Sequence, residues 1–303
     1  MSDAASQAAR SGALLVREPE RRVLSVTGPD RATWLNGVVT CEVAALPPGQ
    51  AAFGLLLSKV GKIQTDFYVL QGASALLLAC APGTRELATV ELERMLVMED
   101  AELTAPATEH TCFALHGPRS AELAEAAKHV SGVVAGTLDR TGLGGVVLLV
   151  PLSGAEALAA ELVGFGAVAA SDAAWQTLRL ERRIGLFGVD YGAADNPHEA
   201  ALDRSAISWN KGCYLGQEVV FMQDARGKLK RRLVQLDMDG APPAPGAPVL
   251  TPEGETAGEV TSSAESSLSG AVVALARVKA PHFEPGARLA VGPAVATVRN
   301  EPI

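Results

Sequence analysis

Alternating and continuous runs of apolar residues predict a series of short strands in the first half of the chain. Apolar and polar positions alternate over residues 22–26, as in a strand with one buried face. Short apolar runs bounded by glycine, serine or proline are typical of buried strands. The predicted strands cover residues 22–26, 52–57, 63–70, 75–80, 111–116 and 146–150.

Apolar residues at three- and four-residue spacing predict helices between and after these strands. Asp30, Thr84 and Ser171 stand where a side chain commonly accepts the first free N–H groups of a helix. Ser153 and Glu156 have the spacing of a capping box. The predicted helices cover residues 30–37, 84–98, 118–130, 153–163 and 171–184. Because successive strands are often too close for a helical crossover, we expect an α+β fold with antiparallel sheets.

The pattern changes after Arg232. A strand is expected at 233–238, a proline-rich segment follows at 241–246, and the remaining chain shows short strands and turns without a helical period. Such a sequence predicts a small all-β barrel or sandwich. The expected organisation is therefore a mixed α+β region at 1–232 and a C-terminal β-domain at 233–303.

Composition narrows the class of protein. The 303 residues are 48% hydrophobic and 20% charged, which fits a globular protein with a sizeable core. A net charge of −8 argues against direct nucleic-acid binding, which normally leaves a basic footprint. Basic residues do cluster at 226–232, where they form either a solvated face or a contact for an anionic ligand. No apolar stretch approaches the ~20 residues of a membrane span, and the N-terminus lacks a secretory pattern, so we expect a cytoplasmic protein without a membrane partner.

The four cysteines, Cys41, Cys80, Cys112 and Cys213, are far apart and form no CxxC pair. The chain is therefore not expected to be a disulfide scaffold or to hold a zinc ion or iron–sulfur cluster by itself. Reduced thiols are the default in the cytoplasm. If a cluster is bound, a partner must supply ligands, because such clusters usually take four.

Residues 211–218, Lys-Gly-Cys-Tyr-Leu-Gly-Gln-Glu, contain the strongest candidate for chemistry. Glycines on both sides of Cys213 allow a tight turn or a close backbone approach to a ligand. A cation such as Lys211 favours the reactive thiolate form of a nearby cysteine. The alternative is a buried cysteine that packs as a small apolar residue in a glycine-rich turn.

This octapeptide resembles the signature of the YgfZ-like folate-binding proteins, relatives of the aminomethyltransferase (T-protein) of the glycine cleavage system. Further similarity lies at residues 26–37, 55–66, 179–190 and 258–264, so the resemblance covers most of the chain. It implies two interleaved α+β subdomains that form a folate site, followed by a C-terminal β-barrel.

The resemblance also implies a function. A YgfZ-like protein binds tetrahydrofolate or a derivative and acts in iron–sulfur cluster assembly or repair, with an indirect link to tRNA modification. Cys213 would be the functional thiol and a transient ligand of a shared cluster, with iron–sulfur assembly proteins or client enzymes as partners. Lys211, Gln217 and Glu218 would assist it, the last two by bracing the cysteine loop or by positioning a ligand. We expect a monomer with transient partners.

Glu181 is the candidate folate ligand. The related T-proteins hold the pterin ring with a glutamate in the matching Arg-x-Glu segment, here Arg179 to Glu181, and a carboxylate can accept two parallel N–H bonds. The alternative is an ion pair of Glu181 with a neighbouring arginine. The anionic glutamate tail of a folate would contact basic residues, for which the candidates are Arg226, Lys228 and Arg231.

Asp66 is the second candidate, and it bears on an alternative function. T-proteins carry an Asp-Asp pair that assists methylene transfer, whereas this chain has Thr65-Asp66. A neutral hydroxyl cannot act as a general base as a carboxylate can. This departure counts against the alternative, a folate-dependent aminomethyl or one-carbon transferase. A scaffold that no longer binds folate is a third possibility, and a purely structural role of Asp66 remains open.

Pro197-His198-Glu199 begins like a zinc-protease motif but lacks the second histidine, so metal binding there is not expected. Glu199 is expected to belong to a loop leading to the signature and could line the cavity.

Overall fold

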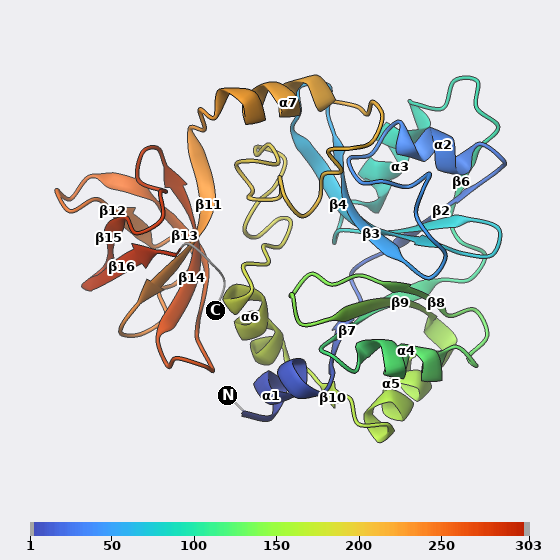
Figure 1. Cartoon of the computed structure of the whole chain (residues 1–303), viewed down its shortest axis with the longest axis horizontal. Coiled ribbons are helices and arrows are strands. Elements are labelled where there is room, and N and C mark those ends of the chain that lie inside the picture. Colours follow the sequence, from blue (N-terminus) through green and yellow to red (C-terminus); the bar gives the residue numbers. More distant parts are fainter. Residues whose placement is uncertain (1–2, 300–303) are drawn as a thin grey trace.

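Two five-stranded sheets and a closed barrel form the framework of the protein in the computed structural model, which describes residues 3–299 (Figure 1). The first sheet has the order β10-β1-β7-β9-β8, with β1 (Leu14–Glu18), β7 (His110–His116), β8 (Val134–Thr137), β9 (Gly145–Pro151) and β10 (Val168–Ala169). The second sheet has the order β3-β4-β5-β2-β6, with β2 (Val23–Thr27), β3 (Ala51–Leu57), β4 (Ile63–Gln71), β5 (Leu76–Cys80) and β6 (Glu102–Thr104).

The two units are interleaved along the chain, as predicted. The chain enters the first sheet at β1, builds the whole second sheet from β2 to β6, and returns to the first sheet at β7. Pairing is antiparallel throughout these sheets except between β1 and β10, which are parallel. The α+β class with antiparallel sheets is confirmed.

The largest apolar core lies between the two sheets. Phe53, Leu55 and Leu70 from the second sheet pack with Val147 and Leu149 from the first. The outer faces are covered by helices: α2 (Arg31–Asn36) and α3 (Arg85–Glu93) lie against the second sheet, and α4 (Ser120–Ala127) and α5 (Ala155–Gly164), preceded by a 3₁₀ turn at Leu152–Gly154, lie against the first. The helices α1 (Asp3–Ser11) and α6 (Asp172–Glu181) pack together beside β1. No helix among the described residues combines the length and apolar character that a membrane crossing requires.

Only one of the expected helix caps is formed. Ser171 Oγ accepts a hydrogen bond from the Ala174 N–H at 3.2 Å at the start of α6. Asp30 instead accepts from the Asp100 N–H, and Thr84 donates to the Ala81 carbonyl and bonds to Thr65. The capping box at Ser153 is wrong, because the chain makes a 3₁₀ turn there and α5 starts at Ala155.

Three helices end several residues earlier than predicted, and one of them, α4, stops at Ala127 rather than at 130. α3 stops at Glu93 rather than near 98, since the following apolar residues Val97 and Met98 are exposed and have nothing to pack against. α6 stops at Glu181 because Arg183 adopts a left-handed conformation with φ of 58°. The sequence patterns also missed α1, β1, β6, β8, β10 and the helix α7 (Gln217–Arg226).

The C-terminal region is a closed six-stranded barrel, as predicted. Its order is β11-β14-β13-β12-β15-β16, closed by the pairing of β11 with β16. The strands are β11 (Arg231–Met238), β12 (Pro248–Leu250), β13 (Thr256–Glu265), β14 (Val272–Lys279), β15 (Arg288–Val291) and β16 (Ala294–Val298). The domain limits 1–232 and 233–303 stay a prediction, and positions 1, 2 and 300–303 lie outside the described residues.

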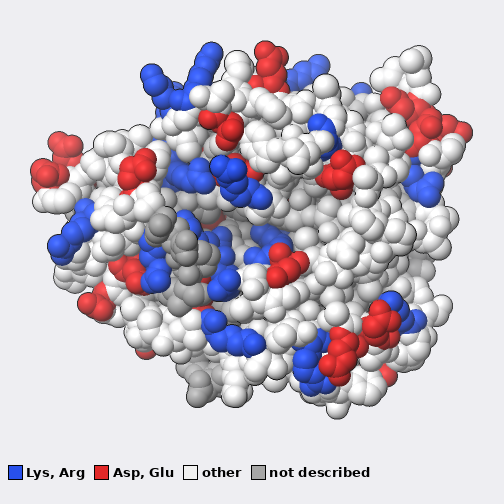
Figure 2. Space-filling model, in the orientation of Figure 1, with Lys and Arg blue, Asp and Glu red and all other residues white. Residues whose placement is uncertain are grey.

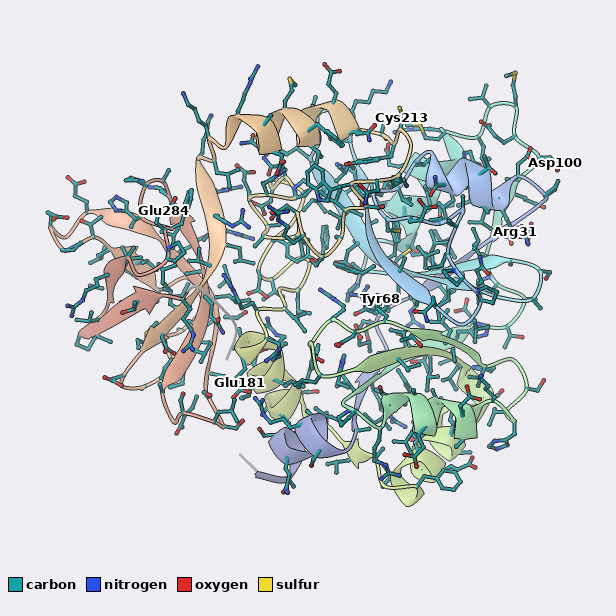
Figure 3. All side chains as sticks on the ribbon, in the orientation of Figure 1. Arg31, Tyr68, Asp100, Glu181, Cys213 and Glu284 are labelled. Atoms are coloured by element: carbon teal, nitrogen blue, oxygen red, sulfur yellow. The ribbon has the colours of Figure 1, made fainter. Side chains whose placement is uncertain are left out.

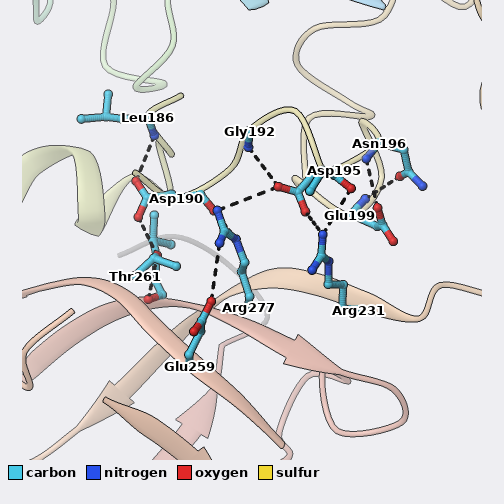
Figure 4. Close-up of polar contacts among 12 residues, drawn as sticks. Leu186, Asp190, Gly192, Asp195, Asn196, Glu199, Arg231, Glu259, Thr261 and Arg277 are labelled. Atoms are coloured by element: carbon cyan, nitrogen blue, oxygen red, sulfur yellow. Dashed lines mark hydrogen bonds and ion pairs between the residues drawn. The ribbon is translucent and has the colours of Figure 1, made fainter. Parts of the chain in front are cut away.

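A buried polar network fastens the barrel to the mixed region (Figure 4). The Arg179 guanidinium donates to Asp190 at 2.8 Å, and both side chains are almost completely buried. Thr261 of the barrel donates to the other Asp190 oxygen at 2.6 Å, and Arg277 donates to the Asp190 carbonyl. A second contact joins Arg231 of β11 to Asp195 at 2.7 Å. Segment 190–195 therefore joins the barrel to α6.

Candidate functional site

A cavity of about 530 Å³ lies where both sheets, the segment after α6 and the first barrel strand meet. Figure 2 shows a hollow near the middle of the face in view, with Lys and Arg side chains around it. Volumes of this size are common for small-molecule sites. The lining residues are Phe53, Leu138, Asp139, Arg140, Arg182, Arg183, Ile184, Ala201, Leu202, Arg204, Ser205 and Arg232.

The lining of this cavity is strongly basic. It includes five arginines and one carboxylate, Asp139. That carboxylate is engaged by its own turn, where it accepts hydrogen bonds from the N–H groups of Thr141, Gly142 and Gly144. Arginine side chains present paired N–H donors that match carboxylate and phosphate groups. The cavity therefore suits an anionic ligand.

Arg140 combines charge with an apolar platform. Its guanidinium carbon lies 3.8 Å from the centre of the Phe53 ring, and Nη1 donates to Tyr68 Oη at 3.3 Å. Burial lowers the pKa of Arg140, but the neighbouring Tyr68, Tyr191 and Asp66 outweigh burial, so its pKa is raised. Arg140 thus stays charged beside an aromatic face, where a flat ligand ring can pack.

Backbone strain is concentrated at the same cavity. Arg183 (φ 58°) and Ala201 (φ 56°) are the non-glycine residues with positive φ in the described chain, and both line the cavity. Such conformations cost on the order of 1–3 kcal/mol each and persist mainly at functional sites. This placement supports a binding role for the cavity.

Neither residue of the Arg-x-Glu segment lines the cavity. Glu181 is buried, and its Oε1 accepts hydrogen bonds from the hydroxyls of Ser266 and Ser267 and from the Ser267 N–H. Its ion pair is with Arg10 of α1 at 3.5 Å, not with one of the adjacent arginines. Figure 3 shows Glu181 beside α6, on the side that faces the barrel. Pterin binding by Glu181 stays a prediction, and it requires the carboxylate to release the two serines.

Asp66 is held inside the protein. It is 1% exposed, accepts from Arg21 Nη1 at 2.9 Å and from Tyr191 Oη at 2.5 Å, and lies within β4. Thr65 is also buried and bonds to Thr84. This geometry fits a structural role of Asp66, which pairs with Arg21 from the middle of a strand and not from its end.

Cys213 lies exposed at the surface, whereas Cys41, Cys80 and Cys112 are buried. Figure 3 places Cys213 beside the start of α7. The nearby Lys211 ammonium is occupied by three backbone carbonyls, those of Asn36, Val39 and Cys41, at 2.6–2.7 Å. Lys211 therefore fastens the signature segment to loop 36–41.

Glycines allow the signature segment to approach the β3–β4 turn. Gly216 has φ of 79°, and a Cβ there would lie 2.7 Å from the Ser58 carbonyl oxygen. A Cβ on Gly61 of the turn would lie 2.9 Å from Val219. Gln217 and Glu218 begin α7 directly after this contact, and their side chains make no hydrogen bond within residues 3–299, contrary to the expected bracing.

The basic run contributes less to the cavity than expected. Arg226 and Lys228 are exposed at the end of α7, and Arg231 is paired with Asp195, so none of them lines the cavity. Its neighbour Arg232 does. Arg182 and Arg183, which follow Glu181 in the sequence, were considered only as its ion-pair partners. No sequence pattern pointed to Arg140 or Arg204, which lie on loops at the cavity.

The Pro197-His198-Glu199 segment is structural in the described chain. His198 Nε2 lies 3.4 Å from Asp224, and Glu199 accepts from Lys62 at 3.1 Å. Glu199 is not among the cavity-lining residues, and no group of three metal-binding side chains occurs in the part of the chain that is described.

Comparison with known proteins identifies the class. Residues 4–138 match the GCVT N-terminal domain, and residues 231–301 match the glycine cleavage T-protein C-terminal barrel domain. The mitochondrial aminomethyltransferase of Gallus gallus is 30% identical over 297 residues, covering 88% of this chain and 74% of the relative. The aminomethyltransferase of Herpetosiphon aurantiacus is 29% identical over 317 residues, covering 98% of this chain and 86% of the relative. The chain belongs to the glycine cleavage T-protein (aminomethyltransferase) family.

The fold agrees with this assignment. The crystal structure of the glycine cleavage system aminomethyltransferase T from Bartonella henselae superposes with a TM-score of 0.84 over 99% of this chain and 88% of that one. At 24% identity, this similarity concerns the fold.

Proposed function

We propose that this protein binds tetrahydrofolate or a derivative in the arginine-lined cavity and uses Cys213 in iron–sulfur cluster assembly or repair of client enzymes. On this account it is a cytoplasmic, YgfZ-like member of the family, an assembly factor rather than a transferase, and it meets iron–sulfur assembly proteins or clients transiently. The limits 1–232 and 233–303 are proposed as its folate-binding and barrel domains.

The chemistry of the cavity supports folate. Phe53, Leu138 and Ile184 offer apolar contacts for a flat ring, and the arginines offer donors for the carboxylates of a glutamate tail. The tail is thus proposed to contact Arg204 and Arg232 in place of Arg226, Lys228 and Arg231, because the first two line the cavity. The bound folate would supply a one-carbon group or act as a regulator, while these side chains bind and orient it.

The observation that carries the assembly role is the exposure of Cys213 alone among four cysteines. Its loop is fixed by Lys211 and by the glycine contact with the β3–β4 turn, so the thiol is presented in a defined place. A single exposed thiol suits transient ligation of a cluster shared with a partner, since the remaining ligands must come from outside the chain.

Cys213→Ser tests this role. We expect a deletion strain complemented with the variant to lack activity of a [4Fe–4S] client enzyme, while calorimetry shows unchanged tetrahydrofolate binding. A matched Cys112→Ser variant, altered at a buried cysteine, should restore the client enzyme if it folds. Full restoration by Cys213→Ser would reject a functional thiol.

The second candidate is a folate-dependent aminomethyl or one-carbon transferase, which the family membership favours. The sequestered Asp66 and the hydroxyl of Thr65 count against it, since neither offers an accessible carboxylate base. Formation of methylenetetrahydrofolate from an aminomethyl-loaded lipoyl carrier, lost in Asp66→Asn, would favour this candidate.

A further inference from the structure

The outer surface of α7 has an unusual composition for a helix of this acidic chain. Of its ten residues only Val220 is buried. Phe221 is 41% exposed and Met222 38% exposed, and Val60, on the adjoining β3–β4 turn, is 67% exposed. Val219 of α7 lies against Gly61 of that turn, so the turn that bears Val60 adjoins α7.

Cations surround these apolar residues. Lys59 on the turn and Arg226, Lys228 and Lys230 at the far end of α7 are all exposed. None of the four cationic side chains takes part in an ion pair or hydrogen bond within the described residues, whereas most arginines elsewhere on the surface are paired with acids. Figure 2 shows Lys and Arg side chains projecting at the upper left, where α7 leads into β11 in Figure 1. We call this surface, Lys59, Val60, Phe221, Met222, Arg226, Lys228 and Lys230, the α7 patch.

The α7 patch differs in sign from the molecule as a whole. The chain carries a net charge of −8, and the acids on α7 are Glu218 and Asp224, the second of which faces His198. Positive charge on one face of a negative protein steers an acidic partner to that face and repels it elsewhere. Exposed Met and Phe side chains are typical of the centres of protein interfaces.

The end of the α7 patch coincides with Cys213. The exposed thiol lies just before the N-terminus of α7, and the segment that carries it is fastened to the same β3–β4 turn that bears Lys59 and Val60. A partner seated on α7 would therefore cover or approach the thiol.

We propose that the α7 patch is the docking surface for an acidic protein partner, whose apolar contacts fall on Phe221, Met222 and Val60. The proposal rests on the proposed function of Cys213 and adds the surface and charge of its partner. An acidic protein surface is favoured over a nucleic acid because the exposed Phe221, Met222 and Val60 offer apolar contacts that a protein interface can cover and a phosphate backbone cannot.

A first test uses two small probes of Cys213 with different charge. The dianionic disulfide 5,5′-dithiobis(2-nitrobenzoate) and the neutral 4,4′-dithiodipyridine both react with an exposed thiol. The quantity compared is the rate of reaction with the anionic probe divided by the rate with the neutral probe. We expect this ratio to fall at least about threefold in the double variant Lys59→Glu/Arg226→Glu, and to fall in the native protein when salt is added. The matched control is Arg288→Glu on β15, which should leave the ratio unchanged; Arg288 is exposed and has no ion pair among residues 3–299. An unchanged ratio in the double variant would mean that the α7 patch exerts no field at the thiol and would overturn the proposal.

A second test identifies the occupant. The photoreactive amino acid benzoylphenylalanine replaces Met222 in the full-length protein, which is expressed in its own cells. In the control it replaces Val295 on the barrel. We expect Met222 alone to cross-link an acidic protein that is then named by mass spectrometry, purified and titrated. Its affinity should fall at least about tenfold in Lys59→Glu/Arg226→Glu and remain native in Arg288→Glu. Cross-linking only to a second copy or to RNA, equal yield from Val295, or native affinity of the double variant would overturn the proposal.

The two proposals fail in distinguishable ways. If Cys213→Ser restores the client enzyme, the proposed function fails irrespective of these tests. If Cys213→Ser is inactive but Lys59→Glu/Arg226→Glu restores the client enzyme fully and cross-links as the native protein does, the thiol role stands and the docking surface is wrong.

Discussion

At the residue scale, Arg183 and Ala201 hold similar strained backbones but differ in charge. Glycine at either position removes the Cβ that disfavours positive φ, at the cost of greater chain entropy in the unfolded state. We expect Arg183→Gly and Ala201→Gly each to change the free energy of unfolding by less than about 1 kcal/mol. Only Arg183→Gly removes a guanidinium that can donate to the ligand, so we expect folate binding to weaken about tenfold or more in this variant and to stay native in Ala201→Gly. Equal affinities of both variants in calorimetry would remove Arg183 from the site.

His116 predicts a dependence of stability on pH. Burial lowers its pKa from 6.5 to about 4, and the ring stacks on Trp175 at 5.0 Å. Both ring nitrogens are buried, and neither has a hydrogen bond within the described residues. Below pH 6.5 this histidine is protonated in the unfolded chain but stays neutral in the folded protein. The free energy of unfolding therefore decreases as the pH is lowered from 6.5 to about 4. The loss is roughly 3 kcal/mol.

Urea unfolding of the native protein and of His116→Phe at pH 7.5 and pH 4 measures this term. The native protein should lose roughly 3 kcal/mol more than the variant over that interval. The same loss in both proteins would show that His116 does not titrate as a buried group.

The site residues show what the sequence could and could not provide. The octapeptide singled out Cys213 because its signal is local, and the structure places this cysteine at the surface, while its role stays a prediction. The surroundings of Asp66 were not predictable, because its partners Arg21 and Tyr191 lie 45 and 125 positions away. Glu181 was likewise assigned from its neighbours, while its contacts come from Ser266 and Ser267 of the barrel.

At the scale of elements, the start of α7 depends on a close contact that only glycine permits. Gly216→Ala places a Cβ 2.7 Å from the Ser58 carbonyl oxygen in addition to straining a positive φ. Gly227 at the end of α7 also has positive φ, but no atom of residues 3–299 lies within 4 Å of its Cβ position. We therefore expect Gly227→Ala to cost about 1 kcal/mol and Gly216→Ala at least about 1–2 kcal/mol more.

Chemical unfolding of the two glycine variants checks this difference, and the rate of alkylation of Cys213 reports on the loop. Faster or slower alkylation is expected in Gly216→Ala alone. If both variants lose the same stability, the contact between α7 and the β3–β4 turn is not tight.

Most elements could be predicted because they carry a strong apolar period. The strands β2, β3, β4, β5, β7 and β9 and the helices α2 to α6 follow their apolar positions, whereas β6, β8 and β10 are short or partly exposed and leave no such pattern. β1 was missed although its first three residues are buried. α7 escaped prediction because it buries only Val220. α7, the helix that carries the proposed docking surface, thus lacks the apolar period of a core helix because most of its side chains face solvent.

At the scale of the whole molecule, the Arg179–Asp190 pair joins α6 to the barrel because Ser262 and Thr261 of β13 bond to its two members. Asp190→Ala leaves the buried Arg179 guanidinium without its ionic partner, which should cost about 3–5 kcal/mol. We expect calorimetry to show two separate unfolding transitions, for the barrel and the mixed region. Asp237→Ala, which removes a half-exposed carboxylate paired with Arg299 within the barrel, should cost less than about 1 kcal/mol. One unsplit transition in Asp190→Ala would show that other contacts suffice to couple the domains.

The central claim is that a folate binds in the arginine-lined cavity, independently of the thiol. Calorimetric titration of tetrahydrofolate into the native protein, Arg140→Gln, Arg288→Gln and Cys213→Ser tests it most directly. The account predicts one site, an affinity at least about tenfold weaker in Arg140→Gln, and native affinity in the other two variants. Absence of binding to the native protein, or native affinity in Arg140→Gln, would contradict it.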